Sequence, residues 1–249
     1  MAGREERMDV VGVIPCRYKS SRFPGKSIAM ICGKPMVWHV WNQAKKTKYV
    51  NKLIVASDDN RIYDVCSQYG IDSIMTSENL VTGTDRVAEV AKRIEGDIFV
   101  NIQGDEPLID PQGIDRVVLE IMNNGDNIVN AFSLIENMSD IVNGNVVKVI
   151  TSSNGYALAY SRSPIPYPKE SDCQYKRQIG LYAIKRDEIL NFPLLKRGYL
   201  ELSEGIEMFR FLENEYKIKM AQVSDNESIP VDVPDDIKRV EALMKKVEK

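Results

Sequence analysis

Short apolar runs that alternate with helix-like segments restrict this chain to a small set of folds. DVVGVIP (residues 9–15), KLIVAS (52–57) and DIFVNIQ (97–103) have the composition of buried strands. Helical segments are expected between these runs, at residues 35–46, 58–70 and 84–96, the last capped by Thr84 or Asp85. Alternating strands and helices are typical of a layered α/β domain with a mostly parallel sheet.

The second half of the chain breaks this strict alternation. Strands are expected at 127–135, 146–150 and 217–223. A strand followed by a Pro- and Ser-rich stretch is expected over 155–169, and a strand followed by a helix over 177–189. One helix is expected over 199–216, and an amphipathic helix that starts at Pro234 closes the chain. The sequence contains no internal repeat and no low-complexity linker. One domain over residues 1–249, with a smaller lobe inserted near 135–200, therefore fits better than two independent domains.

Composition excludes several functional classes. A net charge of −3 argues against a general nucleic-acid binder, since such proteins carry a basic excess. Four cysteines without a C-x-x-C pair, together with a single histidine, argue against a zinc site. The first residues lack the apolar segment of a signal peptide, and no run is long enough to span a bilayer. We therefore expect a cytoplasmic protein with no membrane partner.

A cluster of basic residues follows the first predicted strand directly. In open α/β sheets, ligands bind beyond the carboxyl ends of the strands, which places this loop at a binding edge. Arg17, Arg22 and Lys26 can reach a triphosphate there, and the hydroxyls of Ser20 and Ser21 can donate hydrogen bonds to it. The loop matches neither the P-loop pattern nor the glycine fingerprint of dehydrogenases. A solvated basic loop without a ligand is the alternative.

An acidic residue stands at the same expected edge of the sheet. Asp105 follows the third strand in QGDEP, and Asp232 follows a short apolar stretch in IPVDVPDD. Because Mg²⁺ takes one or two carboxylates together with phosphate oxygens, both residues are candidate magnesium ligands opposite the basic loop. Taken singly, Asp105 could be a turn residue and Asp232 a helix cap.

Several of these stretches together resemble the 3-deoxy-manno-octulosonate cytidylyltransferase (CMP-Kdo synthetase) family. The matching stretches, in the family's order from residue 10 to residue 240, are VIPCRYKSSRFPGK, GKPMVWHV, ASDD, GTDRVAEV, VNIQGDEPLI, VVKVI, ALAYSRSPIPY, IGLYAI and VDVPDDI. The resemblance implies a nucleotidyltransferase-type, Rossmann-like fold with an inserted dimerisation lobe. It also implies transfer of CMP from CTP to the anomeric hydroxyl of a 2-keto-3-deoxy sugar acid, with release of pyrophosphate.

The resemblance also implies a role for particular residues. Catalytic roles fall to Arg22, Lys26 and Asp105, with Arg22 and Lys26 favouring charge on the leaving pyrophosphate, and the metal ligands are Asp105 and Asp232. The CTP-binding set is Arg17, Ser20, Ser21, Arg22, Lys26, Ala56, Ser57, Asp58, Thr76, Gly83, Thr84 and Gln103. The sugar-acid set is Arg86, Arg162, Gln178, Tyr182, Glu204, Glu207 and Met208.

Two positions depart from the family pattern, both on the implied sugar side. Gln178 stands where the family usually has His, and Met208 stands where it usually has Gln. Gln can replace a neutral His as a hydrogen-bond donor, whereas Met cannot replace the amide of Gln. The acceptor could therefore be Kdo, a modified Kdo such as an amino or deoxy analogue, or another acid such as a nonulosonic acid.

Other functional classes are less well supported by the sequence. A non-catalytic nucleotide-binding protein would not need Asp105, Asp232, Arg22 and Lys26, which are all present. Under the family interpretation we expect Mg²⁺ as cofactor, CTP and a 2-keto-3-deoxy sugar acid as partners, a homodimer, and supply of lipopolysaccharide or capsule biosynthesis.

Overall fold

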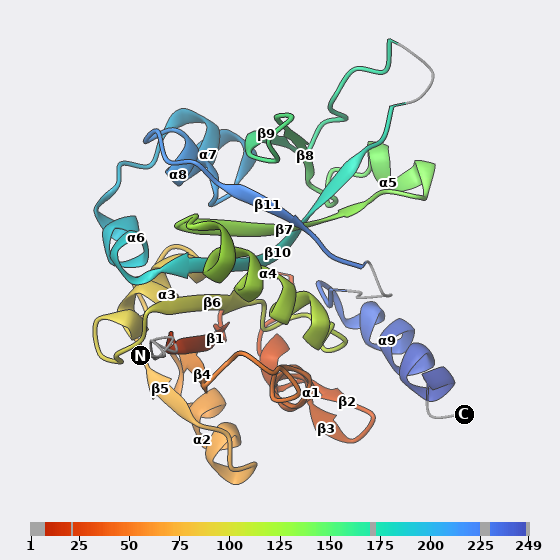
Figure 1. Cartoon of the computed structure of the whole chain (residues 1–249). Coiled ribbons are helices and arrows are strands. Elements are labelled where there is room, and N and C mark those ends of the chain that lie inside the picture. The colour runs from red at the N-terminus through yellow and green to blue at the C-terminus, as the bar shows by residue number, and fades with distance from the viewer. Residues whose placement is uncertain (1–7, 21, 170–172, 225–229, 248–249) are drawn as a thin grey trace, which may run out of the picture.

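The computed structural model describes residues 8–20, 22–169, 173–224 and 230–247. Within them a mixed sheet has the strand order β11-β7-β10-β6-β1-β4-β5 (Figure 1). The strands are β1 (Val10–Cys16), β4 (Lys52–Ser57), β5 (Ser73–Met75), β6 (Ile98–Ile102), β7 (Ile128–Leu134), β8 (Lys148–Thr151), β9 (Ala157–Ser161), β10 (Lys176–Lys185) and β11 (Lys219–Gln222), with β2 (Met30–Ile31) and β3 (Lys34–Pro35) as a separate pair. The expected α/β fold with a mostly parallel sheet is confirmed, because β6, β1, β4 and β5 run parallel.

Helices cover both faces of this sheet (Figure 1). They are α1 (Met36–Ala44), α2 (Asn60–Gln68), α3 (Gly83–Ala91), α4 (Pro111–Asn124), α5 (Met138–Val142), α6 (Arg186–Asn191), α7 (Tyr199–Glu204), α8 (Phe209–Leu212) and α9 (Pro234–Val247), with short 3₁₀ turns η1 (Lys26–Ile28) and η2 (Phe192–Leu194). No helix among the described residues has the length and apolar character needed to cross a membrane.

The alternation of β1 shows how the two faces are built. Ile14 and Cys16 pack into one hydrophobic cluster with α1, α2 and α4, while Val11 and Val13 pack into another with α3 and α8. Successive side chains of a strand point to opposite faces, so a strand buried on both faces must be apolar at every position. This explains why the sequence of β1 is a continuous apolar run.

β10 was expected as a strand followed by a helix, but the sequence did not predict its place in the sheet. It lies between β6 and β7 and is antiparallel to both. The expected lobe near 135–200 thus contains a central strand. The part that lies off the main strand order consists of α5, β8, β9 and the loop after β9, and β8 joins it to the sheet by pairing with β10 (Figure 1). We call α5, β8, β9 and the loop to residue 169 the arm. Its role in dimerisation stays a prediction.

Two local expectations were wrong. The single helix over 199–216 is divided into α7 and α8, because Gly205 adopts φ = 64° at the end of α7 and a left-handed residue terminates a helix. The cap of α3 is Thr82 instead of Thr84 or Asp85, and Asp85 is the reciprocal partner in a capping box.

Candidate active site

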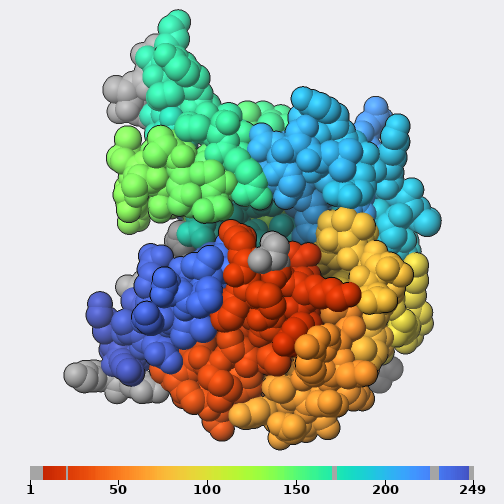
Figure 2. Space-filling view, turned by 180° about the vertical axis from the view of Figure 1, so that it is seen from behind, coloured from red at the N-terminus to blue at the C-terminus, as the bar shows by residue number. Residues whose placement is uncertain are grey.

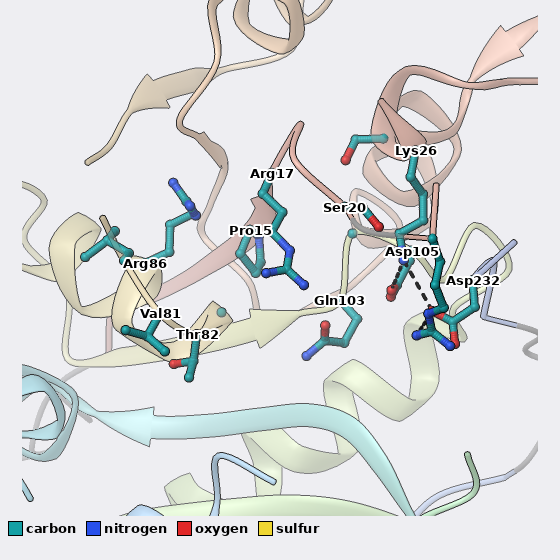
Figure 3. Close-up of a pocket in the computed structure, with 15 residues that line it drawn as sticks. Pro15, Arg17, Ser20, Lys26, Val81, Thr82, Arg86, Gln103, Asp105 and Asp232 are labelled. Atoms are coloured by element: carbon teal, nitrogen blue, oxygen red, sulfur yellow. Dashed lines mark hydrogen bonds and ion pairs between the residues drawn. The ribbon is translucent and has the colours of Figure 1, made fainter. Parts of the chain in front are cut away.

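A cleft opens at the carboxyl ends of β1 and β6, where the basic loop and the QGDEP turn meet (Figure 3). Its cavity has a volume of about 290 Å³. The space-filling view shows the hollow between the N-terminal body and the later segments that include the arm (Figure 2). Of the predicted nucleotide-side residues, those that line it are Arg17, Ser20, Arg22, Lys26, Gly83, Gln103, Asp105 and Asp232.

The basic loop is shaped by its own backbone. Gly25 adopts φ = 71°, and its N–H donates to the Tyr18 carbonyl at 2.9 Å, which closes the loop before η1. A side chain at Gly25 would meet the Tyr18 ring at 3.2 Å, in a conformation that disfavours any residue with a Cβ. The closure holds Ser20, Arg22 and Lys26 at one wall of the cleft. Ser21 lies outside the described residues.

The cations of this wall already face carboxylates. Lys26 Nζ lies 2.6 Å from Asp105 Oδ2 and 3.6 Å from Asp232 Oδ1, and Arg22 Nη2 lies 3.0 Å from Asp232 Oδ1 (Figure 3). Because both carboxylates contact one ammonium group, they lie close enough together to share a cation.

These two carboxylates are a suitable donor set for Mg²⁺, which binds through one or two carboxylates and completes its shell with water and substrate phosphates. The described residues contain no cluster of three or more His, Cys, Asp or Glu side chains that could hold a metal ion. The rest of the shell of a magnesium ion held by Asp105 and Asp232 would come from water and substrate oxygens.

Arg86, which was predicted to belong to the sugar-acid set, lines this first cavity beside the basic loop. It is 4% exposed, its Nη2 lies 2.9 Å from Asp58 Oδ2, and its Nη1 donates to Thr76 Oγ1. It lines the nucleotide-side cavity together with Val81 and Thr82. Burial and a paired carboxylate fix this guanidinium in place, so it shapes the cleft wall.

Three residues of the predicted nucleotide set are buried behind the cleft. Ala56, Ser57 and Thr84 have 0% exposure and do not line the cavity. The Ser57 carbonyl accepts a hydrogen bond from Thr76 Oγ1 at 3.0 Å, so β4 supports the wall through its backbone. These three side chains do not line the cavity, and the assignment of their residues to the border of the nucleotide stays a prediction.

A second cavity, of about 500 Å³, adjoins the first. The two share Arg17, Val81, Thr82, Gly83, Gln103, Asp105 and Asp232, so they form one continuous cleft. Of the predicted sugar-side residues, Arg162, Gln178, Tyr182 and Glu207 line the second cavity. We call the first cavity the nucleotide end and the second the acceptor end.

Glu207 connects the acceptor end with α3. Its Oε2 accepts a hydrogen bond from the Thr84 N–H at 3.1 Å, at the start of that helix. Burial raises the pKa of Glu207 above its ordinary value, although the hydrogen bond from Thr84 opposes the shift. Burial likewise raises the pKa of Tyr182 well above 10, and the nearby Glu207 adds to the shift.

Besides Arg86, two predicted sugar-side residues do not line the second cavity. Met208 has 0% exposure and packs within the hydrophobic cluster around α8, so its assignment to the sugar pocket is wrong. Glu204 is occupied at the base of the arm, where it accepts hydrogen bonds from Ser161 Oγ at 2.7 Å and from the Arg162 N–H at 2.8 Å. It holds the strand end that carries Arg162.

A buried charge network beneath the cleft was missed in the sequence. Arg210 Nη1 lies 2.6 Å from Asp85 Oδ1, and its Nη2 lies 2.7 Å from Glu201 Oε1. Glu201 also pairs with Arg197, and both line the acceptor end. The T-x-x-D capping pattern at Thr82 could have located Asp85, but no local signal links it to Arg210, 125 residues away.

Comparisons with known proteins agree with this geometry. A family model described as Cytidylyltransferase matches residues 11–218. A 3-deoxy-manno-octulosonate cytidylyltransferase from Trichlorobacter lovleyi is 42% identical over 96% of this chain and 99% of its own length. One from Solibacter usitatus is 43% identical over 95% of this chain and 94% of its own length.

A solved structure is also closely similar. CMP:2-keto-3-deoxy-manno-octonic acid synthetase complexed with CTP superposes with a TM-score of 0.91 at 34% identity, over 96% of this chain and 99% of the other. A 4-diphosphocytidyl-2C-methyl-D-erythritol synthase from Anaerococcus prevotii, at 14% identity and a TM-score of 0.64 over 96% of this chain and 100% of the other, shares the fold.

Proposed function

This chain belongs to the cytidylyltransferase family, among the 3-deoxy-manno-octulosonate cytidylyltransferases, and we propose that it transfers CMP from CTP to the anomeric hydroxyl of Kdo and releases pyrophosphate. The observation that carries the proposal is the continuous cleft. A polyphosphate-compatible wall at one end and a polar cavity at the other meet at Gln103 and Asp105. The comparisons do not favour a nonulosonic acid as the acceptor.

In this reaction the acceptor end would hold the sugar that supplies the attacking hydroxyl, and the nucleotide end would hold the triphosphate. The sugar hydroxyl attacks the α-phosphorus of CTP, the bond from that phosphorus to the bridging oxygen breaks, and negative charge grows on the leaving pyrophosphate. Lys26 and Arg22 stand on the wall where that charge would develop. Asp105 and Asp232 hold both cations at this wall before a substrate binds, so the cations lie close to the point where that charge forms.

We propose Asp105 and Asp232 as the ligands of Mg²⁺. When bound, the ion would neutralise negative charge on the triphosphate and make the α-phosphorus more electrophilic. Lys26 and Arg22, whose carboxylate partners would then face the metal, would be released toward the phosphates.

We also propose that the arm mediates a homodimer. Large apolar side chains on the arm are exposed to solvent, namely Met138 (76%), Val142 (74%), Leu158 (61%) and Tyr167 (86%). Exposed apolar residues gathered on one projection are typical of protein interfaces. Light scattering after chromatography should give twice the mass of the chain, and Leu158→Asp should shift the protein to monomer. A monomeric wild-type protein at micromolar concentration would contradict the dimer.

A cytoplasmic location and a role in lipopolysaccharide or capsule supply complete the proposal. Both rest on the use of CTP and on the family resemblance.

The direct test is pyrophosphate release from CTP in the presence of Mg²⁺ and Kdo, with CMP-Kdo identified by mass spectrometry. Reactions with ATP or UTP, without an acid, and with a nonulosonic acid serve as controls. Dependence on both CTP and Kdo is expected. Faster turnover of the nonulosonic acid would replace Kdo as the acceptor, and binding of CTP without pyrophosphate release would favour the non-catalytic alternative.

A further inference from the structure

An irregularity in β10 lies directly beside the acceptor end of the cleft. Gln178 pairs with Phe132, and Tyr182 pairs with Asn130, so the register shifts between these two points. The four-residue step on β10 opposes a two-residue step on β7. Extra residues in one strand form a β-bulge, which re-aims the neighbouring side chains. Gln178 and Tyr182, on either side of this bulge, both line the cavity.

The side chain of Asn130 fills the bulge and has 0% exposure. Its Nδ2 donates to the carbonyl of Ile179 at 2.8 Å, and to those of Leu181 and Ala131 at 3.2 Å each. A backbone carbonyl can only accept a hydrogen bond, so the nitrogen of this amide must face these three groups. The orientation of Asn130 is thereby fixed, and its Oδ1 points away from the carbonyls.

Gln178 supplies the donor that Asn130 Oδ1 requires. Gln178 Nε2 lies 3.1 Å from Asn130 Oδ1, which commits the nitrogen side of the Gln178 amide to the bulge. Within the described residues, no group donates to Gln178 Oε1. Because the side chain lines the acceptor cavity, this oxygen is placed to accept a hydrogen bond from a ligand there.

We propose that Gln178, oriented by Asn130, is a hydrogen-bond acceptor toward the sugar acid and selects a substrate that carries a donor group, such as a hydroxyl, at that point. This inference rests on the proposed function and assigns a polarity to one of its contacts. It reverses the expectation that Gln178 replaces a histidine as a donor. Asn130 is the positioning residue, because its side chain is fully buried and does not line the cavity.

A histidine at position 178 can reproduce this polarity in one protonation state only. A neutral imidazole that donates one N–H to Asn130 leaves its other nitrogen as an acceptor, whereas an imidazolium presents a second donor. The Gln178→His variant should therefore lose kcat/KM for Kdo as the pH falls below about 6.5, the ordinary pKa of histidine. The wild type should lack this loss.

Neighbouring charges affect both proteins in the same way. The charged groups that line the cavity around position 178 include Arg162, Arg177, Glu106 and Glu207. They are common to the wild type and the variant, so a difference between the two pH profiles reports residue 178. Gln68→His, at an exposed position on α2, is the matched control and should keep the wild-type profile.

Kdo analogues provide a second readout. In a panel with one hydroxyl at a time replaced by fluorine, leaving the attacking anomeric hydroxyl in place, each analogue nearly keeps the size of the substituent and loses the donor. For one member of the panel, kcat/KM of the wild type should fall by about tenfold or more relative to Kdo, because the Gln178 oxygen would be left without a hydrogen-bond donor. Gln178→Leu, which cannot accept, should discriminate less against that member alone.

The outcomes separate this inference from the proposed function. Turnover of Kdo with no member of the panel sensitive to Gln178→Leu, or a Gln178→His variant that is more active at low pH, would overturn the acceptor role. A wild-type protein that does not turn over Kdo at all would overturn the proposed function, and the inference with it.

Discussion

The two ends of the cleft are built in different ways. Apart from Asp232, which precedes α9, the charged side chains of the nucleotide end come from the loop after β1, from α3 and from the turn after β6, all in the parallel strand–helix units of the first half of the chain. The acceptor end takes its residues from the bulged β10, the arm and the stretch around α7 and α8. The first arrangement follows from consecutive strand–helix units, whereas the second requires segments far apart in the sequence to pack together.

The charges at the two ends differ as well. At the nucleotide end, the Arg86–Asp58 pair is buried, but the ion pairs of the basic loop remain accessible, with Lys26 15% exposed, Asp105 27% and Arg22 55%. Beneath the acceptor end, Arg210 is 3% exposed and Glu201 1%. Accessible pairs can exchange partners when a polyphosphate arrives, while a buried network costs several kcal/mol to break. The nucleotide end is therefore suited to exchange and the acceptor end to fixed geometry.

The largest effect is expected from Asp105→Asn, which tests exchange at the nucleotide end. The substitution keeps the size of the side chain but removes the charge that would face Mg²⁺ and that now holds Lys26. Turnover at saturating CTP should fall by about 10³-fold or more, by analogy with losing a preorganised charge. Circular dichroism should show an unchanged fold.

Asp187→Asn, at an exposed site in α6, removes the same charge outside the cleft and should retain wild-type activity. If Asp105→Asn turned over CTP at a near-normal rate with ordinary Mg²⁺, Asp105 would have no part in the mechanism. The comparison of the two ends would then lose its chemical basis.

Lys26→Ala should have the next largest effect, and it falls mainly on kcat. Lys26 faces charge that grows on the leaving pyrophosphate, so its interaction is stronger in the transition state than in the ground state. A loss of about 10²-fold in kcat is expected, with a smaller change in the KM for CTP. Steady-state kinetics measures both, and Lys92→Ala at an exposed position is the control. A change confined to KM would make Lys26 a ground-state anchor.

The difference between the ends also explains how far the sequence could predict the molecule. Lys26 lies at the end of the loop that follows β1, and Asp105 lies in the turn that follows β6, so local patterns were enough to place them at one edge. Gln178 and Met208 cannot be placed this way, because each position depends on non-local packing. The bulge beside Gln178 is held by Asn130, which lies 48 residues earlier in the chain. The end of α7 at Gly205 changes the direction of the chain, and Met208 then lies in the hydrophobic core.

Gly180→Ala tests the point where the two ends meet and should have an intermediate effect. A Cβ at position 180, within the bulge, would lie 2.7 Å from Gln103 Cγ, and Gln103 lines both cavities. Gln103 would have to leave its preferred rotamer, which costs about 0.5–1.5 kcal/mol and corresponds to a loss of up to about tenfold in kcat/KM. Gly144→Ala, which meets no atom within 4 Å, is the matched control. Equal activity of the two variants would show that the placement of Gln103 is unimportant.

Met208→Gln should have the smallest effect on activity and separates packing from recognition at the acceptor end. Its side chain is fully buried in an apolar cluster, so the new amide would lack hydrogen-bond partners and lower the free energy of unfolding by about 1–3 kcal/mol. Since Met208 does not line the cavity, the ratio of kcat/KM between Kdo and its analogues should stay unchanged. Urea unfolding measures the first quantity, and Met208→Leu, which preserves volume, should cost less. A variant that kept its stability but changed its acceptor preference would place residue 208 in the recognition surface after all, and Gln178 would then share control of the substrate with it.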